Sequence, residues 1–398
     1  KLSDAAAAAL RRLETEHPEW LGLTTERHAF GSWFTSGTDP DFDLYAGVEA
    51  PPDDVAALAL WVERIDKSDS RVAEFWSRVC SNEWAKARDA LLLLAARGSW
   101  PEYAWEVALD SWSRDPKAVH DWDEAVQTVV RVHDDLLPML ARAAAGLLVA
   151  AAEHVDPCDQ TLIQALGRLL VLDVEGSLDR QTEEPVFRAL NHPGGRSAQA
   201  LMRMLARRRP EAGSGIPSDL RAELERACDL RIAAARPCRT SLAEQLTVLY
   251  RVDADWTTAH LLPSLRWDSP SEARWAWAGV LRQPRVYPPL IRAIKRDLID
   301  AARRYGELGD ARGGLTALVA GCVLGPEDLL DTSELRQLLE GLGERGLEEL
   351  AGLIEREFHN PRIAREGLWR ERVRPLLTRA WPQRITFKTE RLASQLLR

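Results

Sequence analysis

The sequence predicts an all-α protein, built as an irregular HEAT-like α-solenoid of about eighteen helices that could be divided into two lobes. Three observations predict this class. Apolar residues recur with the period of an α-helix along most of the chain, and helix start and stop signals bracket these stretches. The alternation typical of a β-strand is weak throughout and is best at residues 385–388.

The length of the chain favours stacked helices over a single bundle. A single hydrophobic core stops growing at about 250–300 residues, whereas helix pairs can be added to a stack one after another. The chain has 398 residues. No strict repeat period of about 34–40 residues is visible, so we expect an irregular stack and not a consensus repeat array.

Each expected helix is identified by an apolar stripe along one face. Residues spaced i, i+3, i+4 and i+7, or i, i+4, i+7 and i+8, lie together on a helix because it has about 3.6 residues per turn. In chain order, such stripes cover residues 55–62, 72–79, 198–205, 220–228, 242–250, 273–281, 335–342 and 347–354.

The expected helix ends follow from capping residues. A side-chain oxygen can accept hydrogen bonds from the free amides at a helix start, and glycine supplies the left-handed conformation at a helix end. A proline inside an apolar pattern begins or kinks a helix. We expect starts near Ser218, Ser269 and Thr332, ends at Gly98, Gly341 and Gly343, and starts or kinks at Pro138 and Pro375.

The two expected lobes meet at a polar segment. Residues 173–185 are polar and carry no apolar stripe, which is typical of a linker. We expect an acidic, Trp-rich helical lobe over residues 1–172 and a C-terminal helical lobe over residues 186–398. A second, shorter break falls at residues 211–217, where glycine, serine and proline gather.

Acidic residues gather in the first third of the chain. Residues 1–130 hold 24 Asp and Glu against 13 Lys and Arg, and the remaining residues have a net charge of +2. The net charge of the whole chain is −9, unlike the basic face of a nucleic-acid-binding protein, so we do not expect a nucleic-acid partner. The acidic third is either a solvated face or a surface that meets a basic protein partner.

The composition also bears on location. No apolar run approaches the about 18–20 residues of a membrane span, and no signal-peptide cleavage site follows the first residues. The five cysteines are widely spaced and fit reduced thiols, so we expect a cytoplasmic protein without a membrane partner. Only six of the 52 basic residues are lysines, a bias that we take as a sign of a bacterial genome rich in G and C. Because the chain starts at Lys1 and not at Met, we expect a fragment of a longer protein.

Residues 341–346 match the dinucleotide-binding fingerprint, since they are Gly-Leu-Gly-Glu-Arg-Gly. That fingerprint needs a strand before it and a helix after it, so that the pyrophosphate meets a helix N-terminus. Here the preceding residues 333–340 are expected to be helical, and Glu344 would lie beside the phosphates. We therefore expect a turn between two helices and no nucleotide cofactor.

Three clusters of histidine and aspartate suggest a metal-dependent phosphohydrolase as an alternative function. Such enzymes hold a metal ion with His and Asp from adjacent helices. The clusters are His120 with Asp121, His133 with Asp134 and Asp135, and His154 with Asp156. The competing interpretation is structural: Asp134 and Asp135 would cap a helix that starts at Leu136, and His154 would lie at a helix C-terminus. We assign no metal ligand here.

Other catalytic motifs are missing from the sequence. There is no Cys-x-x-Cys, no His-Glu-x-x-His, no phosphate-binding loop and no Gly-x-Ser-x-Gly elbow. Cys228 falls on an apolar stripe, which favours a buried, inert thiol over a nucleophile. We therefore name no catalytic or cofactor-binding residue, and we expect that this chain is not itself an enzyme.

Four residues are candidates for contact with a protein partner. Arg203, Arg207 and Arg208 belong to the densest basic cluster, at the expected end of a helix, where cations also suit the helix dipole. Trp275 lies two residues from Trp277 on one helix, so the two cannot face the same way. If Trp275 is exposed, it is a candidate anchor for a partner.

The C-terminal half resembles a known protein region. The residues that carry the resemblance are Asn191-His192-Pro193-Gly194-Gly195-Arg196, Asp255-Trp256, Leu262-Pro263, Trp267, Glu272-Ala273, Trp277, Trp369, Val373, Pro375, Trp381-Pro382 and Ser394. In this order they resemble the α-helical region that follows the sirtuin-like domain in bacterial anti-phage defence proteins. The resemblance covers about residues 183–398 and does not extend to residues 1–172.

The resemblance implies a regulatory function. In that family an upstream sirtuin-like domain hydrolyses NAD when infection is sensed, and the helical region recognises a phage component, restrains the enzyme or organises the oligomer. The sirtuin motifs have no counterpart in this chain, so no NAD-binding residue is carried over. We expect an interaction module whose partner is a phage protein or its own effector domain, with homo-oligomerisation an option. The alternatives are the metal-dependent phosphohydrolase and a purely architectural scaffold.

Overall fold

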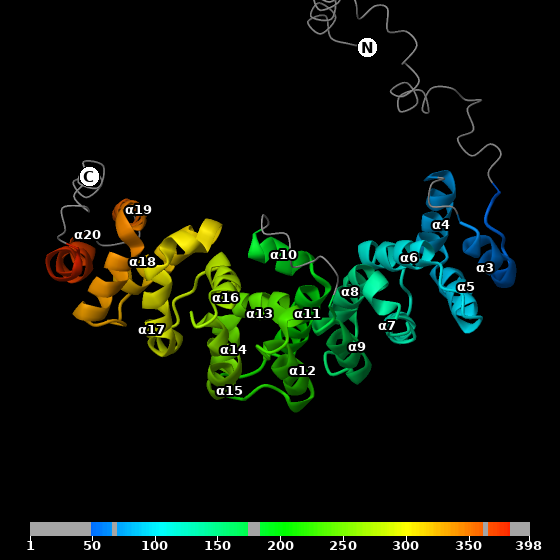
Figure 1. Cartoon of the computed structure of the whole chain (residues 1–398), viewed down its shortest axis with the longest axis horizontal. Helices are drawn as coiled ribbons and strands as arrows, with labels where there is room; N and C mark the ends of the chain where they lie inside the picture. The colour runs from blue at the N-terminus through cyan, green and yellow to red at the C-terminus, as the bar shows by residue number, and fades with distance from the viewer. Residues whose placement is uncertain (1–48, 66–69, 174–183, 361–364, 383–398) are drawn as a thin grey trace, which may run out of the picture.

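The computed structural model describes residues 49–65, 70–173, 184–360 and 365–382, and Figure 1 shows its course. These residues form eighteen α-helices, several short 3₁₀ and π-helical segments and no strand, so the predicted all-α class is confirmed. The weak strand pattern at residues 385–388 lies outside the described residues. The helices are α3 (Val55–Glu63), α4 (Ser70–Asn82), α5 (Trp84–Ala96), α6 (Glu102–Arg114), α7 (Trp122–Val130), α8 (Leu137–His154), α9 (Gln160–Leu170), α10 (Pro185–Asn191), α11 (Pro193–Arg207), α12 (Ser218–Cys228), α13 (Arg236–Glu244), α14 (Leu246–Val252), α15 (Ala254–His260), α16 (Pro270–Arg282), α17 (Pro288–Arg303), α18 (Arg312–Leu324), α19 (Thr332–Phe358) and α20 (Arg365–Leu368).

The helices form an elongated, curved row (Figure 1). Along it α4 packs on α6, α6 on α8, α8 on α11, α11 on α13, and α13 on α16. The row bends so that α4 and α19, near its two ends, rise on the side where α10 lies, and we call this the concave side (Figure 1). Buried apolar residues from Leu58 to Trp381 belong to one continuous cluster.

The predicted boundary between the lobes coincides partly with residues 174–183, which lie outside the described residues. On either side of them, α8 and α9 both pack against α11. The division into two lobes at residues 173–185 stays a prediction.

Tryptophans fill the spaces between neighbouring helices. Trp76, Trp112 and Trp277 are fully buried, and each indole N–H donates to a main-chain carbonyl of a neighbouring segment. The bond from Trp112 to the carbonyl of Cys80, for example, measures 3.0 Å. Each of these three side chains therefore contributes both buried apolar area and a satisfied polar group.

Several predicted helix boundaries are confirmed, although two of the predicted caps are not. α12, α16 and α19 begin at Ser218, Pro270 and Thr332. The start of α19 has a capping box, in which Asp331 accepts from the amide of Glu334 and the Glu334 side chain accepts from the amide of Asp331. At Ser269, however, no side-chain hydrogen bond caps α16, and none is made at the N-cap position of α12.

The glycines of the fingerprint motif behave differently from one another. Gly343 has φ +65° and separates two helical segments of α19, so the predicted turn between helices is confirmed. Outside the motif, Gly98 also adopts the left-handed conformation, at φ +78°.

The motif glycine Gly341 does not end a helix as predicted. It lies where α19 crosses α17, and a Cβ there would be 2.8 Å from the main-chain nitrogen of Arg303. Close helix packing explains this glycine.

Arginine side chains join the C-terminal end of one helix to a later helix. Arg168 on α9 donates to the carbonyls of Val130 and Val132, at 3.1 and 2.7 Å, where α7 ends. Arg207 on α11 donates to two carbonyls at the end of α8, and Arg226 on α12 donates to the carbonyl of Gly167. These bonds satisfy carbonyl groups that have no partner within their own helix.

Candidate interaction surface

The short helix α10 lies on the concave side and packs against α11, α13 and α16 (Figure 1). Val186, Arg188 and Ala189 bury one face of it. The opposite face carries Phe187, which is 57% exposed, and Leu190, which is half-buried. A large apolar side chain thus stands in solvent on a helix whose other face is held by the core.

The first turn of α11 packs very closely against its neighbours, because its two glycines carry no Cβ. A Cβ on Gly195 would collide with the carbonyl oxygen of Ala189 on α10, and one on Gly194 would lie 2.9 Å from the Sγ of Cys238. His192 is buried and caps α11, since its Nδ1 accepts from the amide of Gly194 at 3.1 Å. Burial lowers the pKa of His192 to about 4 and keeps this acceptor neutral.

Trp275 is buried, so the condition for its role as an exposed partner anchor is not met. Only 8% of the residue is exposed. The guanidinium of Arg188 from α10 lies 5.2 Å from the centre of its ring, and that of Arg236 lies 6.0 Å from it. Trp275 thus packs within the junction of α10, α13 and α16.

A buried ion pair lies in the same junction. The side chain of Arg239 on α13 is 1% exposed and that of Glu272 on α16 is 7% exposed. Arg239 donates to both carboxylate oxygens of Glu272, at 2.5 and 3.1 Å, and Arg236 donates to one of them at 3.1 Å. Arg239 also donates to the main-chain carbonyls of Asp229 and Ile232. The pair therefore ties α13 to α16 directly beneath α10.

A groove of about 410 Å³ opens beside α10, and we call it the α10 groove. It has apolar side chains next to an exposed arginine, Arg203, which forms an ion pair of 3.2 Å with Glu153. Another arginine, Arg282, donates to both oxygens of Glu244 at 2.9 Å. The groove is lined by Leu190, Gln199, Met202, Arg203, Ala206, Glu244, Gln245 and Arg282.

Of the three candidate arginines, only Arg203 lines this groove. Arg207 donates to the carbonyls of Ala152 and Val155 at 2.6 Å each. Arg208 forms two bonds with the carboxylate of Asp219, at 2.8 and 2.7 Å, and binds the carbonyl of Pro157. Their hydrogen bonds are therefore made within the chain, to the end of α8 and to α12.

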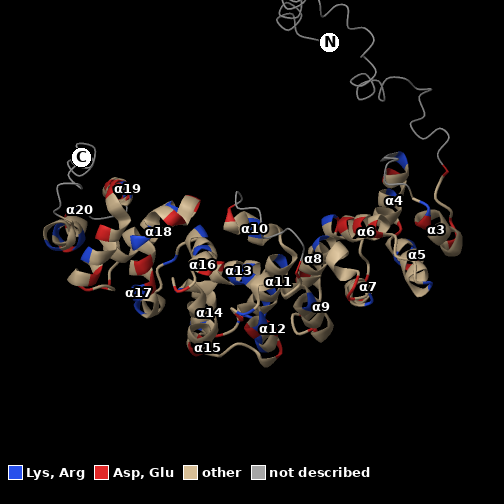
Figure 2. Ribbon diagram, viewed as in Figure 1, with Lys and Arg blue, Asp and Glu red and all other residues tan. Residues whose placement is uncertain are grey.

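The helices around the groove are strongly basic. The blue residues that Figure 2 shows on these helices are all arginines. In α10, α11, α13 and α16 there are only two acidic residues, Glu244 and Glu272. Eight arginines accompany them: Arg188, Arg196, Arg203, Arg207, Arg236, Arg239, Arg274 and Arg282.

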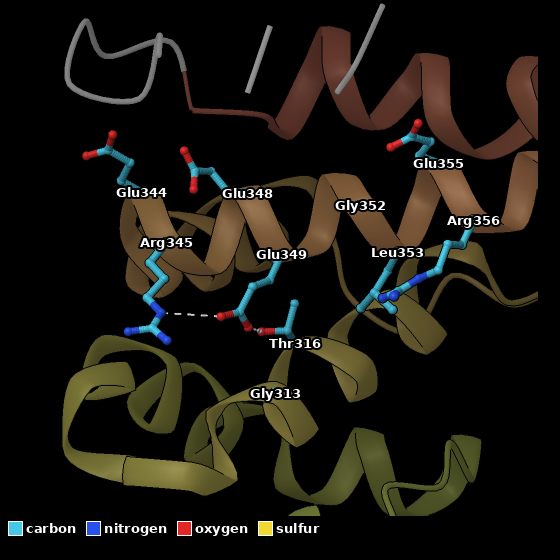
Figure 3. A pocket seen from close by; sticks show the side chains of 10 residues that line it. All are labelled: Gly313, Thr316, Glu344, Arg345, Glu348, Glu349, Gly352, Leu353, Glu355 and Arg356. Atoms are coloured by element: carbon cyan, nitrogen blue, oxygen red, sulfur yellow. Dashed lines mark hydrogen bonds and ion pairs between the residues drawn. The ribbon is translucent and has the colours of Figure 1, made fainter. Parts of the chain in front are cut away.

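A larger groove, of about 980 Å³, lies between α18 and the second half of α19. Figure 3 shows Arg345 and Glu349 pointing from α19 towards Thr316 on α18. The Glu349 carboxylate accepts from the hydroxyl of Tyr305 at 2.7 Å and from the Nε of Arg345 at 3.4 Å. Burial and the neighbouring carboxylate raise the pKa of Tyr305 to about 12. Leu353 is the one large apolar side chain that lines this groove, whereas Leu190 and Met202 both line the α10 groove, so we place the candidate contact in the α10 groove. The larger groove is lined by Gly313, Thr316, Glu344, Arg345, Glu348, Glu349, Gly352, Leu353, Glu355 and Arg356.

The histidine and aspartate clusters are not brought together. Among the described residues, no group of three or more His, Cys, Asp or Glu is placed to hold a metal ion. Asp121 caps α7 by accepting from the amide of Glu124 at 3.0 Å, and His154 ends α8 and stacks on Trp122, with 4.6 Å between the ring centres. His120, in the first cluster, is exposed, and Asp156 accepts from the amide of Cys158 at 2.7 Å.

The predicted caps of α8 are wrong. The N-cap position of α8 is Leu136, and no side chain caps it. Asp134 instead forms an ion pair of 2.6 Å with Arg168 on α9, and Asp135 lies 3.3 Å from the Nδ1 of His133. An arginine from a later helix competes successfully for the carboxylate that the sequence places next to a helix start.

Phe187, Leu190 and Arg282 were not identified from the sequence as site residues. The available signal was the composition of α10, in which Val186, Phe187, Ala189 and Leu190 are apolar and cover more than one helix face. A helix this short buries one face, so one of its large apolar residues has to remain exposed.

Comparison with protein-family models, with curated proteins and with solved structures finds no match for the chain. Within the described residues, no helix combines the length and the apolar character that crossing a membrane requires. A functional proposal therefore depends on the surface itself.

Proposed function

We propose that the chain is a helical interaction and regulatory module, which binds a protein through its concave side and thereby controls or oligomerises an attached effector domain. The observation that carries this proposal is Phe187, which is 57% exposed on α10 and lies three positions, about one helical turn, from Leu190 of the α10 groove. Large aromatic side chains together with arginines are the residues that most often anchor protein interfaces.

The position of α10 suits a regulatory contact. The buried face of α10 meets α13 and α16, where Arg188 covers Trp275 next to the Arg239–Glu272 pair. A partner on the outer face of α10 would act on a helix that is packed against the middle of the row. Binding energy can bias an equilibrium between two arrangements only if the partner binds one of them better.

The resemblance to sirtuin-associated defence proteins supplies the effector in this proposal. The partner of the module is then a phage component or the NAD-hydrolysing domain itself, in the bacterial cytoplasm. In this proposal the chain contributes binding and not chemistry, and the comparisons with known proteins supply no independent support for the effector.

The experiment starts from the complete gene. We expect it to encode an NAD-hydrolysing domain before Lys1, and NAD consumption by the full-length protein to change when Phe187→Asp disrupts the α10 surface. Met139→Asp on α8 is the matched control, because Met139 is 52% exposed and does not line the groove. It lies fourteen positions along α8 from Glu153, the residue that pairs with Arg203. A gene without an effector domain, or equal activity of the Phe187→Asp variant and the native protein, contradicts the proposal.

A further inference from the structure

The α10 groove and one segment of the sequence have opposite chemistry. Residues 30–45 read Phe-Gly-Ser-Trp-Phe-Thr-Ser-Gly-Thr-Asp-Pro-Asp-Phe-Asp-Leu-Tyr. They contain five aromatic and three aspartate residues, and neither lysine nor arginine. They belong to residues 1–48, outside the described part of the chain. An acidic, aromatic peptide of this kind complements a basic surface that has apolar side chains at its centre.

The groove offers both kinds of contact. Leu190 and Met202 provide apolar surface, and Phe187 extends it on the outer face of α10. Arg203 and Arg282 lie at the same groove, with side chains that are 45% and 40% exposed. Each is paired through one guanidinium nitrogen with a glutamate of the chain, Glu153 or Glu244, and a guanidinium has further N–H donors for a second carboxylate. Aromatic rings on the apolar surface and carboxylates on the arginines give the arrangement of an interface with an apolar centre and a polar rim.

The segment cannot bring its aspartates to the groove of its own chain. From α3, packed neighbours lead through α5, α6, α8 and α11 to α10. With about 8–10 Å between the axes of packed helices, these five steps add up to about 40–50 Å along the elongated row. Asp39, the aspartate of the segment farthest from the described residues, precedes Glu49 by ten positions. An extended chain of that length spans at most about 36 Å.

We propose that residues 30–45 of a second copy of this chain occupy the α10 groove. This inference rests on the proposed function and names the contact that assembles the module. The contact joins two different surfaces, so two copies can exchange segments and close a dimer, or successive copies can form an open chain. The aromatic residues of the segment contact Phe187 and Leu190, and its aspartates pair with Arg203 and Arg282.

Sedimentation velocity of the full chain tests the proposal. We expect self-association that weakens as salt is added, because exposed charge pairs are screened. Phe187→Ala and Phe42→Ala should each weaken association by about tenfold, the effect of removing one aromatic anchor. Met139→Ala should leave it unchanged, and circular dichroism should show the same helix content in all variants.

A charge exchange identifies the pairing. Asp41→Arg alone and Arg203→Asp alone should each weaken association, and the double variant should restore it. A fluorescent peptide of residues 30–45 should bind the full chain and dissociate the assembly, and the same peptide with its aspartates changed to asparagine should bind more weakly.

Three results overturn the proposal: a chain that stays monomeric, an assembly indifferent to Phe187→Ala, or one indifferent to both Phe42→Ala and Asp41→Arg. A monomeric chain contradicts the self-association but not the proposed function, because another partner could still control the effector, and the NAD assay tests this. A gene without an effector domain contradicts the regulatory function but does not affect the self-association measurement.

Discussion

Neutralising Glu272 should destabilise the centre of the row by about 3 kcal/mol. Removing one partner of a buried ion pair costs about 3–5 kcal/mol, because the remaining charge has lost its compensation. In the Glu272→Gln variant, Arg239 stays buried but keeps the carbonyls of Asp229 and Ile232 as acceptors, at 2.8 and 3.2 Å. We therefore expect the low end of this range.

The control is Glu244→Gln, which neutralises the partner of Arg282. Arg282 has a side chain that is 40% exposed, so its pair should contribute about 0–1 kcal/mol. Urea unfolding followed by circular dichroism gives the two free energies, and hydrogen exchange of α13 and α16 shows whether the loss is local. An equal, small effect of both variants would refute the idea that the buried pair ties α13 to α16.

Three further outcomes follow from single positions. The depressed pKa of His192, about 4 against an ordinary value near 6.5, means that the unfolded chain binds a proton that the folded chain does not. Stability should therefore be complete above about pH 6.5 and fall by up to about 3 kcal/mol towards pH 4, and His192→Asn should flatten this decline in urea unfolding curves. Gly195→Ala should lower stability by about 3 kcal/mol or prevent folding. Gly313→Ala, where a Cβ meets no atom within 4 Å, should leave the thermal midpoint within about 2–4 °C of the native value. Tyr305→Phe should lower the free energy of unfolding in urea by about 1 kcal/mol, because Glu349 loses a hydrogen-bond donor.

Periodicity predicted the helices because each depends on residues that are close in sequence. The stripes at 55–62 and 198–205, for example, lie on the buried faces of α3 and α11. The turn at Gly343 was predictable for the same reason, since helical patterns on both sides left little room for a strand. The all-α class follows from such local patterns without knowledge of the packing.

The candidate site was less predictable because it depends on residues that are far apart in sequence. Trp275 lies on a face opposite to Trp277 and still becomes buried, because Arg188, from a helix 87 positions earlier, covers its ring. Asp134 has the position of a cap but binds Arg168, which a later helix presents. In both cases the role of the residue is set by an arginine from another helix, which the local sequence does not show.

The bonds from Arg168, Arg207 and Arg226 to carbonyls at the ends of other helices have a consequence for the response of the protein to its solvent. Each joins a charged donor to a neutral main-chain acceptor, so salt weakens it less than a bond between two surface charges. The row should therefore keep its curvature in concentrated salt even where its exterior ion pairs dissolve. Arg168 reaches its two carbonyls through separate nitrogens of one planar guanidinium, an arrangement that the single ammonium of a lysine cannot reproduce.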